Sequence, residues 1–133
     1  MALTVNHPTL KETTVFCHTA SSTGTPIAAV ARCPFRGKIV KVGGVVEAAF
    51  TTDMSVAVAL ISAPAAGAAP GAGTAITGSP FTITAANSAA GTQGSMIPTG
   101  ANNCNEDDVI LFTPSGSTGT NIPATFYAVI QVA

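Results

Sequence analysis

Large apolar residues alternate with small or polar residues along much of this chain, which is the pattern of β-strands with one buried face. The clearest case is the segment 54–60. Its large residues fall on one side of a pleat and its small residues on the other: Met54, Val56, Val58 and Leu60 against Ser55, Ala57 and Ala59. We expect the large-residue face to be buried and the small-residue face to be closely covered.

The chain from Phe35 to Ser62 is the most strongly patterned part of the sequence. We expect a strand over residues 38–42, a turn at the glycine pair Gly43-Gly44, and a second strand over residues 45–50. A helix is disfavoured, because β-branched residues fit pleats better and each interior glycine costs a helix about 1 kcal/mol relative to alanine. A further turn then leads into the strand that begins at Met54.

The same pattern predicts strands elsewhere in the chain. They cover residues 13–19, 27–33, 81–84, 109–112 and 124–132. In the first of these, Phe16 and His18 share one face, and Val15 and Cys17 share the other. The run 109–112 has large residues on both faces, which predicts a strand that is buried on both sides.

About eight short strands separated by Gly, Pro, Ser and Asn turns predict an all-β protein, specifically a jelly-roll-like β-sandwich with long Gly/Pro/Ala loops. A length of 133 residues predicts a single domain over residues 1–133. Residues 1–12 are expected to form an extended N-terminal arm, because His7-Pro8 favours extended backbone. The uncharged segment 63–74 should be a long loop, either a mobile tip or a segment that lies against another subunit.

Charged residues make up only 8% of the chain and the formal net charge is −1. A surface with so little charge does not keep copies apart, so we expect homo-oligomers that cover the strand edges. Four of the five cations lie between Arg32 and Lys41, which is too small a set to predict nucleic-acid binding. The sequence contains no apolar run of about 18 residues, the length that a membrane span needs. No secretory signal is visible either, so we expect synthesis in the cytosol.

The cysteines Cys17, Cys33 and Cys104 are odd in number and widely spaced, which favours buried, reduced thiols. A disulfide, or a metal site that includes His7 or His18, is the alternative. The acidic turn 106–108 offers oxygen ligands, but a hard cation needs about six to eight from converging segments. A solvated turn before a strand explains these carboxylates equally well.

No catalytic constellation is visible. The segment 116–119 lacks the Gly-x-Ser-x-Gly elbow of serine hydrolases, and the few carboxylates outside the acidic turn are scattered. We therefore predict no enzyme activity and no catalytic, cofactor-binding or metal-binding residues. A carbohydrate-binding module is disfavoured because the chain has no Trp and one Tyr, Tyr127, which lies within a predicted strand.

Four segments together resemble the small β-rich decoration or cement proteins of tailed bacteriophage heads. They are Pro34-Phe-Arg-Gly-Lys-Ile-Val-Lys-Val42, residues 52–61, residues 91–100, and the acidic turn that leads into residues 109–112. The likeness covers the chain from Pro34 to the C-terminus and lies in turn-rich strands, few charges, and Ala, Gly and Thr enrichment.

The resemblance implies a jelly-roll-like structural virion protein, made in the host cytoplasm, that binds the exterior of the assembled capsid and stabilises it. Its partners would be the major capsid protein of the same virus and further copies of itself, with a trimer preferred to a dimer. No nucleic acid, membrane or cofactor is implied. A phage fibre or tail module and a receptor-binding or glycan-binding β-sandwich are the alternatives.

Overall fold

The computed structural model describes residues 11–64, 67 and 71–132. Over these ranges the chain forms ten β-strands and no α-helix. The strands are β1 (Glu12–Thr19), β2 (Ala29–Arg32), β3 (Gly37–Val46), β4 (Met54–Ile61), β5 (Thr74–Ala75), β6 (Phe81–Ile83), β7 (Gln93–Met96), β8 (Asn103–Cys104), β9 (Val109–Ser115) and β10 (Ala124–Val132). Within the same ranges, no helix is long and apolar enough to cross a membrane.

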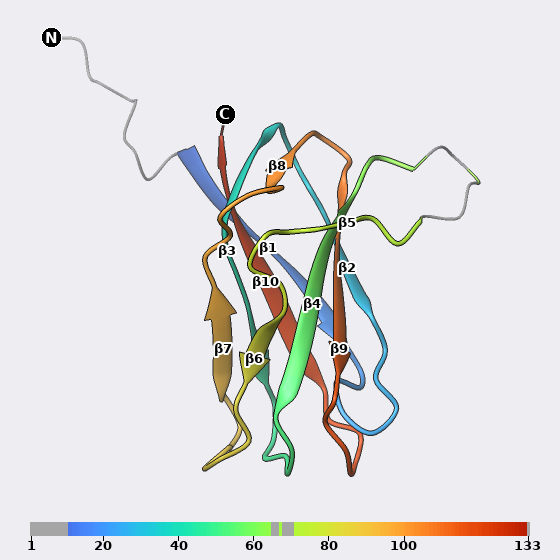
Figure 1. Cartoon of the computed structure of the whole chain (residues 1–133), viewed down its shortest axis with the longest axis vertical. Coiled ribbons are helices and arrows are strands. Elements are labelled where there is room, and N and C mark those ends of the chain that lie inside the picture. Colours follow the sequence, from blue (N-terminus) through green and yellow to red (C-terminus); the bar gives the residue numbers. More distant parts are fainter. Residues whose placement is uncertain (1–10, 65–66, 68–70, 133) are drawn as a thin grey trace, which may run out of the picture.

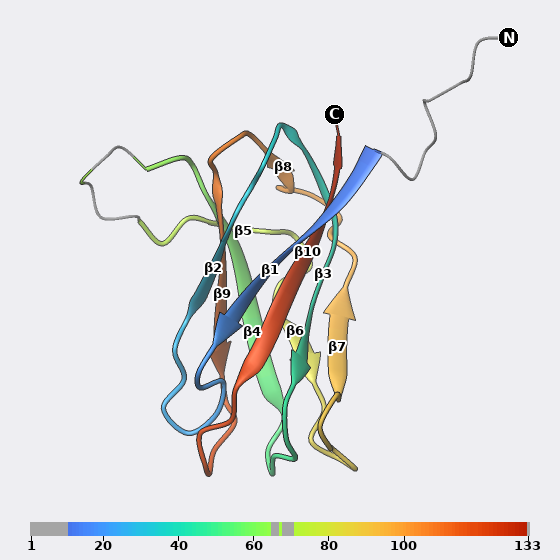
Figure 2. The same cartoon turned by 180° about the vertical axis from the view of Figure 1, so that it is seen from behind.

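Two antiparallel sheets pack face to face (Figures 1 and 2). The first sheet has the order β1-β10-β3-β7, with β8 also paired to β3. The second has the order β2-β9-β4-β5, with β6 also paired to β4. The chain passes from one sheet to the other six times: between β1 and β2, β2 and β3, β3 and β4, β6 and β7, β8 and β9, and β9 and β10. This double Greek-key arrangement is a jelly roll and confirms the predicted fold class.

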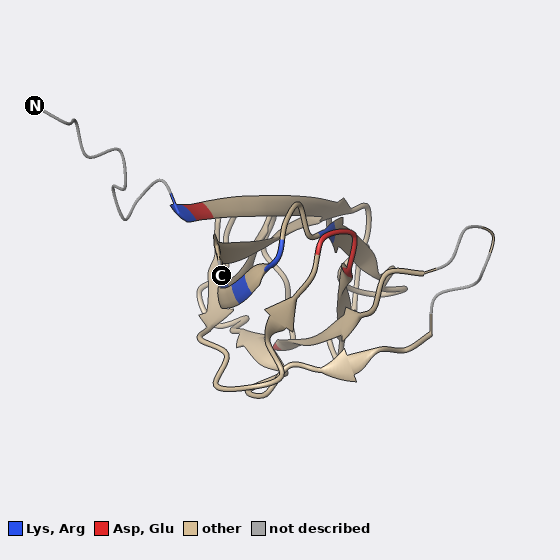
Figure 3. Ribbon diagram, turned by 90° about the horizontal axis from the view of Figure 1, so that it is seen from above, with Lys and Arg blue, Asp and Glu red and all other residues tan. Residues whose placement is uncertain are grey.

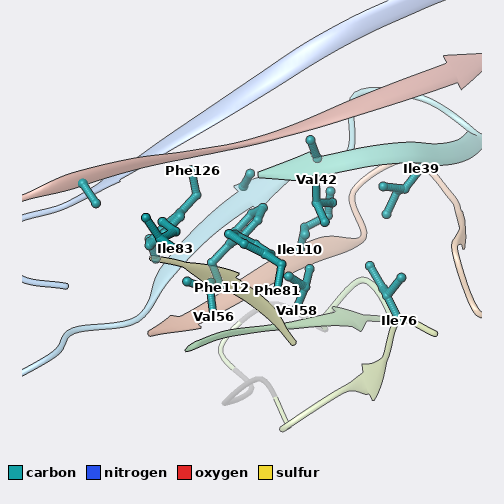
Figure 4. Close-up of a cluster of buried hydrophobic side chains, with 14 of the residues drawn as sticks. Ile39, Val42, Val56, Val58, Ile76, Phe81, Ile83, Ile110, Phe112 and Phe126 are labelled. Atoms are coloured by element: carbon teal, nitrogen blue, oxygen red, sulfur yellow. The ribbon is translucent and has the colours of Figure 1, made fainter. Parts of the chain in front are cut away.

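The inner faces of the two sheets form one hydrophobic core (Figure 4). At its centre, the rings of Phe112 in β9 and Phe126 in β10 are stacked, with centroids 5.2 Å apart and planes inclined by 6°. Ile39 and Ile110 are also fully buried in this core. The core therefore draws its largest side chains from both sheets, as a sandwich requires.

Strand β4 confirms the predicted alternation, because Met54, Val56 and Val58 are all buried in the core. Its small-residue face is not closely covered as predicted, since Ala57 is exposed. Over the described ranges the sandwich has two layers, so the outer face of this sheet meets solvent.

Strand β9 was predicted to be buried on both sides, and this is wrong. Ile110 is in the core, whereas Val109 and Leu111 on the outer face are only half-buried. The strand also continues through Pro114 to Ser115, beyond its predicted end at Phe112. Because β2 pairs with β9 only as far as Phe112, Pro114 has a paired strand on one side and is tolerated there.

Strand β3 is continuous where the sequence predicted two strands and a glycine turn. Gly43 and Gly44 lie within it, paired with Tyr127 and Phe126 of β10. A Cβ atom at Gly44 would come within 2.6 Å of the Phe126 ring, and one at Gly43 within 2.5 Å of the Tyr127 hydroxyl oxygen. The glycines thus allow aromatic rings to approach the backbone on both faces. The strand ends at Val46, so the predicted strand over residues 45–50 is also wrong.

Three short strands, β5, β7 and β8, lie in segments where the sequence predicted no strand. Strand β7 pairs with β3, and its Gly94 approaches the carbonyl oxygen of Thr82 in β6 too closely to leave room for a Cβ atom. Glycine in β7 therefore permits the two sheets to come together at this corner. Its composition, Gln-Gly-Ser-Met, carries little strand propensity.

Parts of two predicted segments lie outside the described residues. These parts are residues 1–10 of the predicted arm, and residues 65–66 and 68–70 of the loop 63–74. Strand β1 begins at Glu12, one residue before its predicted start, and Thr74 begins β5.

Candidate functional site

The outer face of the first sheet carries two neighbouring aromatic side chains. Phe16 of β1 pairs directly with Tyr127 of β10, and Tyr127 pairs with Gly43 of β3. Directly paired residues in antiparallel strands project from the same face of the sheet. Phe16 is 67% exposed, and the ring of Tyr127 lies against Gly43. The two strands lie in front in Figure 2, which shows this sheet from outside.

Neutral side chains lie next to this aromatic pair, and the exposed Lys41 of β3 pairs with one of them, Val129. Val129 lies two residues from Tyr127 along β10, and Val45 pairs with Thr125 of β10; all three are half-buried. We call the surface formed by Phe16, Tyr127, Val45, Val129 and Thr125 the aromatic face. This face is mainly apolar and carries the hydroxyl groups of Tyr127 and Thr125. Such a composition is typical of surfaces that contact another molecule.

An exposed contact between a histidine and a glutamate lies at one end of the aromatic face. His18 Nε2 is 3.3 Å from Glu47 Oε1, and their side chains are 54% and 52% exposed. A pair as exposed as this contributes little to stability. His18 and Cys17 lie on opposite faces of β1, so these two neighbours do not converge on one ion. Within the described ranges, no group of three or more His, Cys, Asp or Glu side chains could hold a metal ion.

The three cysteines are free thiols. Cys33 and Cys104 are buried and Cys17 is half-buried. Burial raises the pKa of the Cys17 thiol from its ordinary 9.0 to about 11. Burial, and then the adjacent Cys104 thiol, raise the pKa of Cys33. Thiols in such surroundings stay protonated and are poor nucleophiles at neutral pH.

The carboxylates of the acidic turn 106–108 have protein partners. Arg32 Nε donates a hydrogen bond to Asp107, and Arg32 Nη2 lies 3.8 Å from Glu106 Oε1. The buried Asp108 accepts hydrogen bonds from the backbone N–H groups of Asn105 and Ala63, at 2.8 and 2.9 Å. These contacts direct the turn towards β2 and the start of the loop after β4, and the three carboxylates do not converge on a common point.

An open pocket of about 520 Å³ lies at the end of the sandwich where β10 ends. It is lined by Arg36, Gly37, Lys38, Asn103, Cys104, Asn105, Gln131 and Val132. The sequence indicated only that cations cluster between Arg32 and Lys41. It did not indicate the pocket, because the lining residues come from three segments that only the fold brings together.

The sequence matches no protein-family model and no curated protein. Solved structures with a similar fold include the cyanophage Pam1 capsid asymmetric unit, at 12% identity and a TM-score of 0.47, covering 92% of this chain and 85% of that chain. The module CsCBM6-3 from Clostridium stercorarium, solved with cellobiose, is 11% identical with a TM-score of 0.47, covering 85% of this chain and 72% of that chain. Eiger TNF from S. frugiperda is 6% identical with a TM-score of 0.48, covering 92% and 94%. At these identities and TM-scores, the three likenesses do not assign a function.

Proposed function

We propose that this protein is a decoration or cement protein, which binds the exterior of an assembled phage capsid and stabilises it. The observation that carries the proposal is the aromatic face. Phe16 exposes most of its ring beside Tyr127 on an open sheet, and apolar area of this kind gains about 25 cal/mol per Å² when a partner buries it.

The shape of this surface favours a macromolecular partner. Small ligands are normally enclosed in concave pockets, whereas the aromatic face lies on the outside of a four-strand path, β1-β10-β3-β7. The resemblance of residues 34–42, 52–61 and 91–100 to phage decoration proteins points to the major capsid protein of the same virus as that partner. The protein would act there as a homo-oligomer, preferably a trimer.

Contacts other than the aromatic face would share the binding. The basic stretch 32–41, the N-terminal residues 1–12 and the loop 63–74 are the remaining candidates. A chain with 8% charged residues and seven aromatic side chains has few groups for dominant single contacts, so affinity would be spread over these segments.

Binding of a Phe16→Ser variant to undecorated capsids tests this proposal. Val30→Ser is the matched control, because Val30 is 57% exposed on β2 of the other sheet. Phe16→Ser should weaken binding on the order of tenfold, in the range of a moderate interface hot spot, whereas Val30→Ser should not. Equal affinities for the wild-type protein and the Phe16→Ser variant would contradict a role for the aromatic face.

One observation favours a second candidate, a glycan-binding β-sandwich. Phe16 and Tyr127 are adjacent aromatic side chains, and Gln93 and Ser95 of β7 are exposed on the same sheet. Stacking on aromatic rings together with amide and hydroxyl hydrogen bonds is a chemistry that suits sugars. Binding to host cells or a glycan array without binding to capsids would favour this candidate.

A further inference from the structure

The pocket at the end of the sandwich has a lining rich in hydrogen-bond donors. Its polar side chains are two cations, Arg36 and Lys38, and three amides, Asn103, Asn105 and Gln131. No carboxylate lines it. Guanidinium and ammonium groups are donors only, and each amide adds two more N–H groups. This set of donors is suited to an anionic acceptor.

Strand pairing aligns the central members of the set. Lys38 of β3 pairs with Asn103 of β8 on one side and with Gln131 of β10 on the other. Side chains on directly paired residues lie about 5 Å apart at Cβ, so these three form one row. Arg36 comes from the turn before β3, and Asn105 from the turn after β8. Paired strands thus carry the three residues of the row, and two turns add Arg36 and Asn105 to the lining of the pocket.

The two cations of this pocket are not taken up by the carboxylates of the acidic turn. The nearby Arg32 is paired with Glu106 and Asp107, and Asp108 is buried against two backbone N–H groups. Within the described ranges, neither Arg36 nor Lys38 forms an ion pair. Figure 3 shows the acidic turn and basic segments around this end of the sandwich. One carboxylate lies close to the row, since the exposed Glu12 of β1 pairs with Gln131. A partner that enters the pocket therefore meets two cations that form no ion pair.

We propose that this pocket binds the carboxylate side chains of an acidic segment on a protein partner. This deepens the proposed function, on which it rests, by naming the chemistry that the capsid surface would present. Carboxylates match the donors of Arg36 and Lys38 through charge-assisted hydrogen bonds. Nucleic acid is disfavoured, because its recognition needs a longer basic stripe than two cations provide.

NMR titration of the full chain with a tetraglutamate peptide tests the pocket without any capsid. Tetraglutamine at equal ionic strength is the control ligand. The account predicts saturable shifts of the backbone amides of Arg36, Lys38, Asn103 and Gln131 with tetraglutamate only. Lys38→Gln should weaken this binding on the order of tenfold, as expected for the loss of one charge-assisted contact.

Lys41→Gln is the matched variant, because Lys41 is exposed on the same strand, outside the pocket lining. It should bind tetraglutamate like the wild-type protein. Equal weakening by both variants, or shifts spread over all exposed cations, would overturn the pocket in favour of diffuse charge attraction. Stronger binding of inorganic phosphate than of tetraglutamate would overturn the assignment to carboxylates. Because this titration uses no capsid, its failure would overturn the pocket proposal without deciding whether the protein binds capsids, which is tested separately.

Discussion

The stacked rings of Phe112 and Phe126 join the two sheets of the sandwich, because one ring projects from β9 and the other from β10. Phe126 also packs against Gly44 of the neighbouring strand β3, where the missing side chain leaves room for its ring. The centre of the core thus depends on two aromatic rings and one glycine from three strands.

Replacing Phe126 with alanine should destabilise the protein strongly. The side chain is fully buried, and its removal leaves a cavity beside Phe112, at a cost of about 3–5 kcal/mol in the free energy of unfolding. Urea denaturation followed by circular dichroism measures this loss. Phe16→Ala is the control and should cost much less, because the Phe16 ring is mostly exposed. Similar losses for both variants would contradict the assignment of Phe126 to the core.

Gly44→Ala should also destabilise the protein, by about 1–3 kcal/mol, as expected for overpacking. Its new Cβ atom would come within 2.6 Å of the Phe126 ring, so the ring or strand β3 must move. Gly71→Ala is the matched control, because a Cβ atom there meets nothing within 4 Å. If thermal melting shows both variants as stable as the wild-type protein, the close approach of Phe126 to β3 is wrong.

The three thiols should resist alkylation in the folded protein. The Cys17 pKa is raised from 9.0 to about 11, so at pH 9 an unfolded Cys17 is half ionised while the folded one is almost wholly protonated. Labelling with iodoacetamide at pH 9 should therefore be slow until guanidinium is added, with the half-buried Cys17 modified before Cys33 and Cys104. Rapid labelling of Cys33 or Cys104 in the native protein would contradict their burial.

The same shift sets the direction of one pH effect. A thiol whose pKa is raised by folding contributes stability that is fully present below pH 9 and is lost as the pH rises towards 11. Cys17→Ala should make the free energy of unfolding less dependent on pH in this window. If the free energy of unfolding of Cys17→Ala depends on pH as strongly as that of the wild-type protein, groups other than Cys17 cause the pH effect.

The fold class was predictable because period-two alternation is a local property of the sequence. Strand β1 shows this, since Val15 and Cys17 lie on the opposite face from Phe16, as predicted. The structure adds that Val15 and Cys17 pack towards the core and that Phe16 lies outside. The role of Gly43-Gly44 was not predictable in this way. A glycine pair signals a turn unless a ring from a distant strand occupies the space that it leaves, and the partners Phe126 and Tyr127 are far away in sequence.

The candidate surfaces were predictable only in part, for the same reason. The sequence placed Phe16 on one face of its strand, and placed Tyr127 in another strand. It did not show that these strands are neighbours, because pairing between the first and last strands of a jelly roll is a property of the whole topology. Strand β8, which brings Asn103 beside Lys38, is only two residues long and leaves almost no pattern.

Sedimentation of the purified protein tests the proposed self-association. The low charge, and the position of β1 at the edge of its sheet in the described part of the chain, favour a homo-oligomer, and we expect a trimer at micromolar concentration. A protein that stays monomeric at this concentration, and that does not assemble when capsids are added, would contradict this part of the account.

The most direct test of the decoration role uses the wild-type protein and capsids that lack it. The purified protein is added in increasing amounts, and bound protein and capsid survival after heating are measured on the same samples. The account predicts saturable binding, with resistance to heat that rises in proportion to occupancy and levels off at saturation. Capsids that bind no protein at saturating concentrations, or that bind it without any gain in resistance, would contradict the proposed function.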